Sequence, residues 1–277
     1  MNNFLLNYFK ILSKKNFDNP FIEIKALINN SRSVKNEIIL SNFHESKINI
    51  EVFKKSFERR LKLEPISKIF NKKDFWDFTF FVNHSVLDPR PETELIIDAA
   101  KKYLINKNQN YKIADLGTGS GCLAISLAKE FYNSNVVATD ISKKALIVAK
   151  KNSLNLKTYK QIEFINCDWI NNNENFDLVV SNPPYLSKKE YENLSDEIKL
   201  YEPKLSLYGG TDGLDCYKKL AHHFKKIGHK NTIYIVEIGY NQKSQCIDIF
   251  RNSSLRCLEI IKDYQSHNRI LVLKNLK

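Results

Sequence analysis

The sequence has few of the residues that mark cysteine-rich, metal-binding or membrane proteins. Its 277 residues include five cysteines, no two of them in CxxC spacing, and six histidines without metal-ligand spacing. An odd number of scattered cysteines is typical of free thiols in a reducing compartment, so we expect a cytoplasmic protein without a bound metal. No stretch approaches the roughly 20 consecutive apolar residues of a membrane-spanning helix, so we expect no membrane partner.

Glycine is also scarce, and its distribution divides the chain. None of the eight glycines lies in the first 116 residues. A glycine-rich loop that cradles a phosphate is therefore excluded from that part of the chain. Any cofactor loop of this kind has to lie in the second part.

The charge is strongly positive, with a formal net charge of +12. One interpretation is an anionic partner such as RNA or DNA. The other is a composition rich in lysine and asparagine, as an AT-rich coding sequence produces. We favour the second, because the lysines are scattered without a run of five, whereas a nucleic-acid footprint is clustered. Nucleic acid is not expected as the substrate.

The first 17 residues are basic and contain no acid, which could indicate a transit peptide. They contain no arginine either, and a secretory signal is disfavoured because Asn7 and Lys10 interrupt the apolar stretch. Helical spacing favours a first amphipathic helix instead, with an apolar face made of Phe4, Leu5, Tyr8, Phe9 and Leu12.

Three segments are predicted along the chain. Residues 1–73 are predicted to form a small helical domain, with Asn19-Pro20 beginning one helix, a second from about Ile48 and a short third opened by Pro65. The residues predicted to face the core are Phe21, Ile24, Leu27 and Ile28 in the first of these helices, and Val52, Phe53, Phe57 and Leu61 in the second. Residues 74–88 are aromatic and predict a hairpin linker, and residues 89–277 form the third segment.

The third segment alternates between strand and helix patterns. After a helix at 92–104, strands are predicted at 112–116, 136–140, 162–166, 177–181, 232–238, 257–262 and 269–274. Helices are predicted at 121–131, 143–152, 213–227 and 241–252. Such alternation is typical of an α/β fold with a Rossmann-like, doubly wound and mostly parallel sheet.

A glycine-rich loop follows the first of these strands. Asp115 is followed by a D-x-G-x-G-x-G pattern that contains Gly117, Thr118, Gly119, Ser120 and Gly121. Alternate glycines let the backbone turn sharply and let a ligand approach without a Cβ clash. The spacing differs from the G-x-G-x-x-G of dinucleotide enzymes and suits a ligand without phosphates, namely S-adenosyl-L-methionine. An ordinary tight turn is the alternative.

Two further residues fit a cofactor site at the carboxyl ends of the strands. Asp140 lies about 20 residues beyond the loop, where an acid accepts both ribose hydroxyls; the alternative is a helix N-cap. Trp169 follows the third strand and is predicted to flank an adenine, with Asp168 accepting from the adenine amino group. The alternative for Trp169 is a core side chain.

The most specific motif is Asn182-Pro183-Pro184-Tyr185 after the fourth strand. Two prolines make a rigid turn, and a bare turn is the alternative. An amide nitrogen is a poor nucleophile, so it has to be held and polarised in front of the sulfonium methyl. We expect Asn182 Oδ1 and the Pro183 carbonyl to accept its two N–H groups, and Tyr185 to pack on the planar group.

With these motifs the chain resembles the HemK/PrmC family of peptide chain release factor glutamine methyltransferases. The resemblance extends over residues 57–60, 64–67, 89–94, 117–121, 182–185, 209–214, 237–240, 263–264 and 268–269. It implies a class I methyltransferase fold, cofactor contacts at Gly117–Gly121, Asp140, Trp169 and Asn182, and substrate contacts at Asn182–Tyr185, Pro184 included. It also implies a helical domain that helps to grip the release factor. Asn71 replaces the family's usual glycine, and Asp88 its usual aliphatic residue.

The substrate has alternatives that local chemistry leaves open. A glutamine of a ribosomal protein, or the exocyclic amine of a DNA or RNA base, also presents a planar N–H group to the Asn182 turn. A scaffold that binds cofactor without catalysis is disfavoured, because it has no need of paired acceptors. We expect the glutamine of the Gly-Gly-Gln motif of a translation release factor, because the resemblance covers nearly the whole chain.

Overall fold

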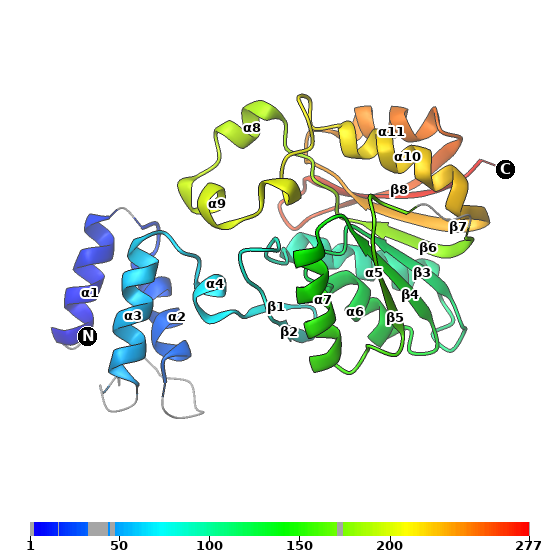
Figure 1. Ribbon diagram of the computed structural model, residues 1–277. Helices are drawn as coiled ribbons and strands as arrows, with labels where there is room; N and C mark the ends of the chain where they lie inside the picture. The colour runs from blue at the N-terminus through cyan, green and yellow to red at the C-terminus, as the bar shows by residue number, and fades with distance from the viewer. Residues whose placement is uncertain (1–2, 16, 33–43, 45–47, 171–173, 277) are drawn as a thin grey trace. The chain divides into compact units, whose positions relative to one another are not determined.

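The computed structural model describes residues 3–15, 17–32, 44, 48–170 and 174–276. It divides into two compact units (Figure 1). The helical unit consists of Met1–Asn71 and Asp196–Tyr201. The sheet unit consists of Lys72–Ser195 and Glu202–Lys277. The predicted boundary after residue 73 did not include the second segment of the helical unit.

The helical unit contains α1 (Asn3–Lys14), α2 (Pro20–Asn30), α3 (Ile50–Leu61), α4 (Ile66–Phe70) and α9 (Asp196–Tyr201). The predicted first amphipathic helix is confirmed as α1, and Asn19 caps α2 by accepting from Ile22 N at 3.2 Å. Asn71 ends α4 with a φ of 54°, a left-handed conformation that asparagine tolerates better than most residues. The core of the unit is made of Leu5, Leu12, Ile24, Leu27, Ile28, Ile48, Phe53 and Phe57.

Two residues of the predicted inward faces are exposed instead. Phe21 is 50% exposed and Val52 is 39% exposed. Phe21 occupies the first turn of α2, where its ring packs against the tilted ring of Phe9, at 4.5 Å between centroids, rather than entering the core. The prediction was wrong at these two positions because helical spacing locates an apolar stripe without fixing its edges.

A buried arginine joins three elements of the helical unit. The Arg60 side chain is 6% exposed, and its guanidinium contacts Glu23 Oε2 at 2.7 Å and Glu197 Oε2 at 3.0 Å. A buried charge is tolerated only when it is paired and hydrogen-bonded, so Arg60 requires both carboxylates. The residues come from α3, α2 and α9, and they explain why residues 196–201 belong to this unit.

The predicted hairpin is present as β1 (Lys73–Phe75) and β2 (Phe78–Phe80), which pair in antiparallel orientation. Phe75 and Phe80 are 1% and 0% exposed, and both belong to the larger core cluster of the sheet unit. The hairpin is thus part of the sheet unit, because its aromatic side chains complete that core.

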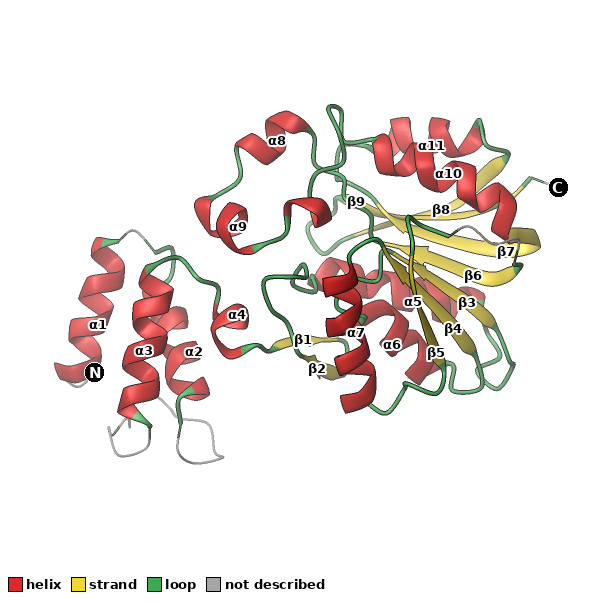
Figure 2. Ribbon diagram, viewed as in Figure 1, coloured by secondary structure: helices red, strands yellow, loops and turns green. Residues whose placement is uncertain are grey.

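The main sheet has seven strands in the order β5-β4-β3-β6-β7-β9-β8 (Figure 2). All pairs from β5 to β7 are parallel, whereas β9 is antiparallel to both of its neighbours. The predicted Rossmann-like α/β fold is therefore confirmed. The strands are β3 (Lys112–Leu116), β4 (Asn135–Asp140), β5 (Ile162–Asn166), β6 (Phe176–Ser181), β7 (Gly228–Glu237), β8 (Leu255–Lys262) and β9 (Asn268–Asn275).

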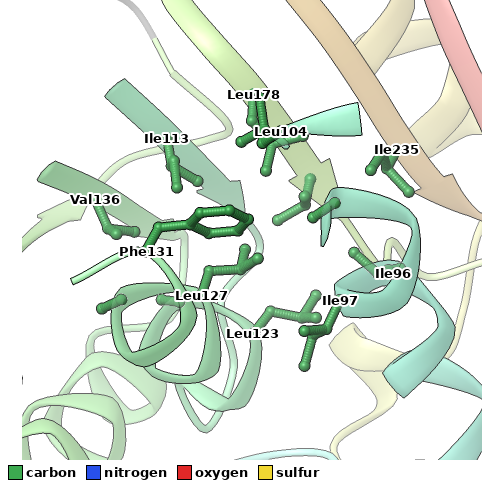
Figure 3. Close-up of a cluster of buried hydrophobic side chains, with 14 of the residues drawn as sticks. Ile96, Ile97, Leu104, Ile113, Leu123, Leu127, Phe131, Val136, Leu178 and Ile235 are labelled. Carbon is green, nitrogen blue, oxygen red and sulfur yellow. The ribbon is translucent and has the colours of Figure 1, made fainter. Parts of the chain in front are cut away.

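Helices cover both faces of this sheet, as the strand–helix alternation predicts. The side chains of α5 (Glu94–Tyr103) and α6 (Cys122–Glu130) form one core cluster with alternate strand residues such as Ile113 and Leu178 (Figure 3). On the other face α10 (Asp215–Ile227) and α11 (Lys243–Arg251) pack on the intervening residues such as Ala114 and Val179. The remaining predicted helix is α7 (Lys143–Asn155), which packs beside α6.

The stretch between β6 and α10 contains three short elements that the sequence pattern did not predict. In chain order, α8 (Lys188–Glu192) precedes α9, and the 3-10 turn η4 (Lys204–Ser206) follows it. A further 3-10 turn, η3 (Pro91–Thr93), leads into α5. Across the described parts of the chain, no helix combines the length and apolar character that a membrane crossing requires.

Candidate active site

A cavity of about 400 Å³ lies at the carboxyl ends of the parallel strands of the sheet unit. Its wall includes the glycine loop after β3, the end of β4, the segment after β5 and the turn after β6. The segment 85–93 and residues between 203 and 219 complete the wall. The structure thus brings together the three motifs that the sequence placed at this edge of the sheet.

The glycine loop is held by two backbone hydrogen bonds that it donates to the neighbouring strand β4. Gly117 N and Thr118 N both donate to Thr139 O, at 3.0 and 2.8 Å. Gly117 and Gly119 have φ values of +80° and +56°, in the region that side chains disfavour. A Cβ at Gly119 would meet no described atom within 4 Å, so this glycine faces open space. That space is where the loop was expected to admit a ligand.

Gly121 has a different role from the other loop residues. Among the five described residues 117–121, it is the one that does not line the cavity. A Cβ there would approach Ala149 Cβ at 3.1 Å, so its lack of a side chain permits α6 to pack against α7. The resemblance had grouped it with the cofactor contacts, and the structure gives it a packing role.

Asp140 connects the end of β4 to the glycine loop. Its Oδ2 accepts from Gly119 N at 2.9 Å, and its Oδ1 accepts from Ser142 N at 2.8 Å. The helix-cap alternative is excluded, because Ser142 is the N-cap of α7 and accepts from Ala145 N at 3.2 Å. Burial raises the pKa of Asp140, and the two backbone hydrogen bonds oppose that rise.

A second acid lies behind the loop. Asp115 is fully buried, and its Oδ2 accepts from Thr118 Oγ1 at 2.6 Å and from Ala124 N at 3.1 Å. Burial raises the pKa of this carboxyl to about 7, against the lowering effect of the two hydrogen bonds. Asp115 therefore ties the loop to the first turn of α6.

Trp169 is a core side chain, as the alternative interpretation had it, and it also borders the cavity. It is 9% exposed and belongs to the core cluster on the α10 and α11 face, and it also lines the cavity. A Cβ at Gly117 would lie 3.8 Å from its ring. Asp168 also lines the cavity, and its Oδ2 lies 3.5 Å from Lys219 Nζ.

The Asn182-Pro183-Pro184-Tyr185 turn leaves β6 next to the glycine loop, and Ser181 Oγ donates to Leu116 O at 2.7 Å. Of the four described residues of the turn, Asn182 and Pro184 line the cavity, whereas Pro183 and Tyr185 do not. Burial raises the pKa of the Tyr185 hydroxyl well above its ordinary value, so the hydroxyl stays neutral.

The segment from Tyr208 to Gly213 and the side chain of Gln242 fix the far end of this turn. Gln242 Nε2 donates to Tyr185 O at 2.9 Å, and Gly209 N donates to Leu186 O at 2.9 Å. A Cβ at Gly209 would lie 2.7 Å from Pro184 O and 2.8 Å from Tyr185 Cα. The glycine is thus required by the close approach of two backbone segments.

Thr93, which contacts Asn182, and Glu237, which contacts Thr93, were given no individual role by sequence reasoning. Asn182 Nδ2 donates to Thr93 Oγ1 at 3.0 Å, and Thr93 Oγ1 donates to Glu237 Oε2 at 2.6 Å. Glu237 is 1% exposed, and burial raises its pKa to about 7, although Thr93 and Arg269 lower it. The sequence carried one signal, since Glu237 is an acid at the carboxyl end of the apolar run 233–236, as Asp140 is in its own strand.

Comparison with known proteins agrees with this geometry. Residues 93–199 match the family model of the methyltransferase small domain. A methyltransferase from Pyrococcus furiosus has the same fold, with a TM-score of 0.52 and 15% identity over 79% of this chain and 96% of that one. The fold and the matched domain place the protein among the class I, Rossmann-like methyltransferases.

Two relatives narrow this class. The release factor glutamine methyltransferase of Caulobacter vibrioides is 33% identical over 94% of this chain and 91% of its own length. The chain therefore belongs to the release factor glutamine methyltransferase family. A bifunctional methyltransferase of Rickettsia typhi is 37% identical over 94% of this chain. The chain spans about half of the length of that relative, 54%.

Proposed function

We propose that the protein transfers a methyl group from S-adenosyl-L-methionine to the side-chain amide nitrogen of the glutamine in the Gly-Gly-Gln motif of peptide chain release factors. One observation carries this proposal: the carboxamide of Asn182 lines the cavity, and its Nδ2 already donates to Thr93 Oγ1. Its Oδ1 is therefore the atom that accepts from a substrate N–H. Full-length likeness to a release factor enzyme supports the choice of glutamine.

The residues around the cavity fit this cofactor. The open space in front of Gly119 gives room for an adenosine, and Asp140 lies beside it with lone pairs for the ribose hydroxyls. The ring of Trp169 provides an apolar wall for the adenine, with Gly117, Thr118 and Ser120 along the loop. Bound S-adenosyl-L-methionine supplies a sulfonium methyl group, a strong electrophile that carries no phosphate.

The Asn182 turn would orient the target nitrogen. Asn182 Oδ1 accepts one N–H, and the Pro183 carbonyl accepts the other. Pro184, which lines the cavity, and Tyr185, which follows it in the same rigid turn outside the cavity lining, would limit the rotation of the planar amide. These contacts would keep the nitrogen lone pair directed at the methyl carbon, and alignment of this kind contributes on the order of several kcal/mol to catalysis. The new C–N bond would form as the bond between the methyl group and sulfur breaks and leaves a neutral thioether, and one N–H proton would leave to solvent.

The helical unit would recognise the protein substrate rather than take part in the chemistry. All residues proposed above for the cofactor and the target amide belong to the sheet unit. The role of residues 1–71 as a grip on the release factor is what the family resemblance implies. Removing them is expected to weaken modification of an intact release factor while leaving cofactor binding in place.

Mass spectrometry of a purified release factor tests the proposed function. The factor is incubated with the protein and S-adenosyl-L-methionine, and the Gly-Gly-Gln peptide is searched for one added methyl group. Parallel reactions contain a Gln→Ala version of the motif, a ribosomal protein mixture, RNA and DNA. Methylation of the motif glutamine is the expected result. Methylation confined to a ribosomal protein or a nucleobase would overturn the substrate assignment.

A further inference from the structure

We propose that Thr93 and Glu237 are positioning residues that hold the Asn182 carboxamide in one of its two orientations. In that orientation Nδ2 faces the protein and Oδ1 faces the substrate nitrogen. This inference rests on the proposed function, because it explains how the acceptor for the target N–H is presented. We call the three side chains the amide relay.

The orientation of an asparagine amide matters because its two ends have opposite hydrogen-bonding character. The oxygen accepts and the NH₂ group donates, while the two are nearly the same size. A rotation of half a turn about the last bond would present Asn182 Nδ2 to the substrate NH₂ group. Two donors would then face each other, and the nitrogen would not be held.

The relay removes this ambiguity through the single hydrogen of a hydroxyl group. Thr93 Oγ1 lies 2.6 Å from Glu237 Oε2, and an ionised carboxylate can only accept, so the hydroxyl hydrogen is directed to Glu237. The remaining lone pairs of Thr93 require a donor, and Asn182 Nδ2 lies 3.0 Å away. Thr93 and Glu237 are 2% and 1% exposed, so water does not compete for these bonds.

The elements that carry the relay are firmly packed. Glu237 is the last residue of β7, which pairs in parallel with β6 next to Ser181 and Asn182. Thr93 ends η3 and begins the packed helix α5. Thr93 and Glu237 thus lie at a helix start and a strand end, and from these firm positions they hold the turn residue Asn182.

Protonation of Glu237 would reverse the relay. A protonated Glu237 can donate to Thr93 Oγ1. The Thr93 hydroxyl would then donate toward Asn182, and the Asn182 amide would turn so that Oδ1, and not Nδ2, faces Thr93. The groups that face Glu237 are Arg269 on β9, Arg90 and Glu92 before α5, Tyr185 after β6 and Tyr217 on α10, whose hydroxyl donates to Glu237 O. Burial raises the Glu237 pKa to about 7, so we expect kcat to fall as the pH decreases through about 7.

Thr93→Val tests the relay with little change of shape. It is expected to lower kcat about tenfold, the effect of roughly one lost hydrogen bond, while the Kd for S-adenosyl-L-methionine stays within about twofold. Thr93→Ser keeps the hydroxyl and is expected to restore most of kcat. Thr232→Val is the matched control, since Thr232 is fully buried and donates to Phe176 O at 2.6 Å. Loss of the Thr232 hydroxyl is expected to lower the melting temperature and to leave kcat unchanged.

Two measurements separate this inference from the proposed function. The side-chain ¹⁵N resonance of Asn182, identified by its disappearance in Asn182→Ala, should show slow hydrogen exchange in the native protein and in Thr93→Ser, and fast exchange in Thr93→Val. This result needs no methyl acceptor, so it stands even if the release factor is not the substrate. Glu237→Gln should abolish the kcat decrease near pH 7. Unchanged exchange in Thr93→Val, or an unchanged pH profile in Glu237→Gln, would overturn the relay.

Discussion

The two sides of the cavity are built by different means. On the cofactor side, backbone groups do most of the positioning: left-handed glycines shape the loop, and two loop N–H groups donate to Thr139 O. On the Asn182 side, the side chains of Thr93, Glu237 and Gln242 contribute most, together with the close backbone approach at Gly209. A backbone-built site is visible in sequence as a glycine pattern, whereas a side-chain-built site depends on residues far apart in the chain.

The largest effect is expected from Asn182→Ala, which removes the proposed acceptor. Transition-state alignment should suffer most, so kcat is expected to fall roughly a hundredfold or more. The Kd for S-adenosyl-L-methionine should change much less, and calorimetry with a single-turnover assay measures both. Turnover near the native rate would show that the acceptor lies elsewhere.

Asp140→Ala is expected to have the opposite pattern, with a larger effect on cofactor affinity than on kcat. Losing hydrogen bonds to a charged acceptor should cost about 3 kcal/mol, or roughly a hundredfold in cofactor affinity. The variant also frees Gly119 N and Ser142 N, so Asp140→Asn serves as the control that retains one acceptor. Titration calorimetry decides: an unchanged Kd in Asp140→Ala would remove this residue from the cofactor site.

A pair of glycine substitutions compares the two sides directly. Gly209→Ala places a Cβ 2.7 Å from Pro184 O, against backbone that cannot move easily, and should destabilise the protein by about 1–3 kcal/mol and lower kcat. Gly119→Ala meets open space and carries only the cost of its left-handed backbone, about 1–2 kcal/mol. Gly119→Ala should raise the cofactor Kd and leave the turn intact. Chemical denaturation measures the loss of stability, and titration calorimetry measures the cofactor Kd. A Gly209→Ala variant as active as the native protein would contradict the expected effect on the Asn182 turn.

A pH-dependent effect on stability, with no direct effect on the reaction, concerns Asp115 behind the glycine loop. Its folded-state pKa of about 7 exceeds the ordinary aspartate value of 3.8, so the folded protein retains a proton that the unfolded chain loses. The contribution to stability is complete below about pH 4 and is lost as the pH rises to about 7, with a slope of at most about 1.4 kcal/mol per pH unit.

Asp115→Asn keeps the shape and removes this titration. The difference in unfolding free energy, variant minus native, should therefore become more positive between about pH 4 and pH 7 and then level off. Urea denaturation of the cofactor-free proteins at several pH values measures it. A difference that does not vary with pH would show that Asp115 titrates in its ordinary range.

Most of the sheet unit could be predicted from sequence because its patterns are local. Each strand begins and ends within a few residues of its predicted bounds, since buried apolar runs between helices mark them. The short elements α8 and η4 have too few turns to show a period. The Asn182 turn was recognised from its own residues, but the link between Thr93 and Glu237 spans 144 positions and leaves no local trace.

The discontinuity of the helical unit affects how the protein is made. Residues 196–201 complete that unit, and Glu197 lies 137 positions after Arg60. During synthesis the helices α1 to α4 emerge long before α9, so Arg60 has Glu23 as its nearby acid until most of the sheet has been translated. The N-terminal unit therefore reaches its final set of ion pairs late, and an expression vector that stops after residue 71 would encode an incomplete domain.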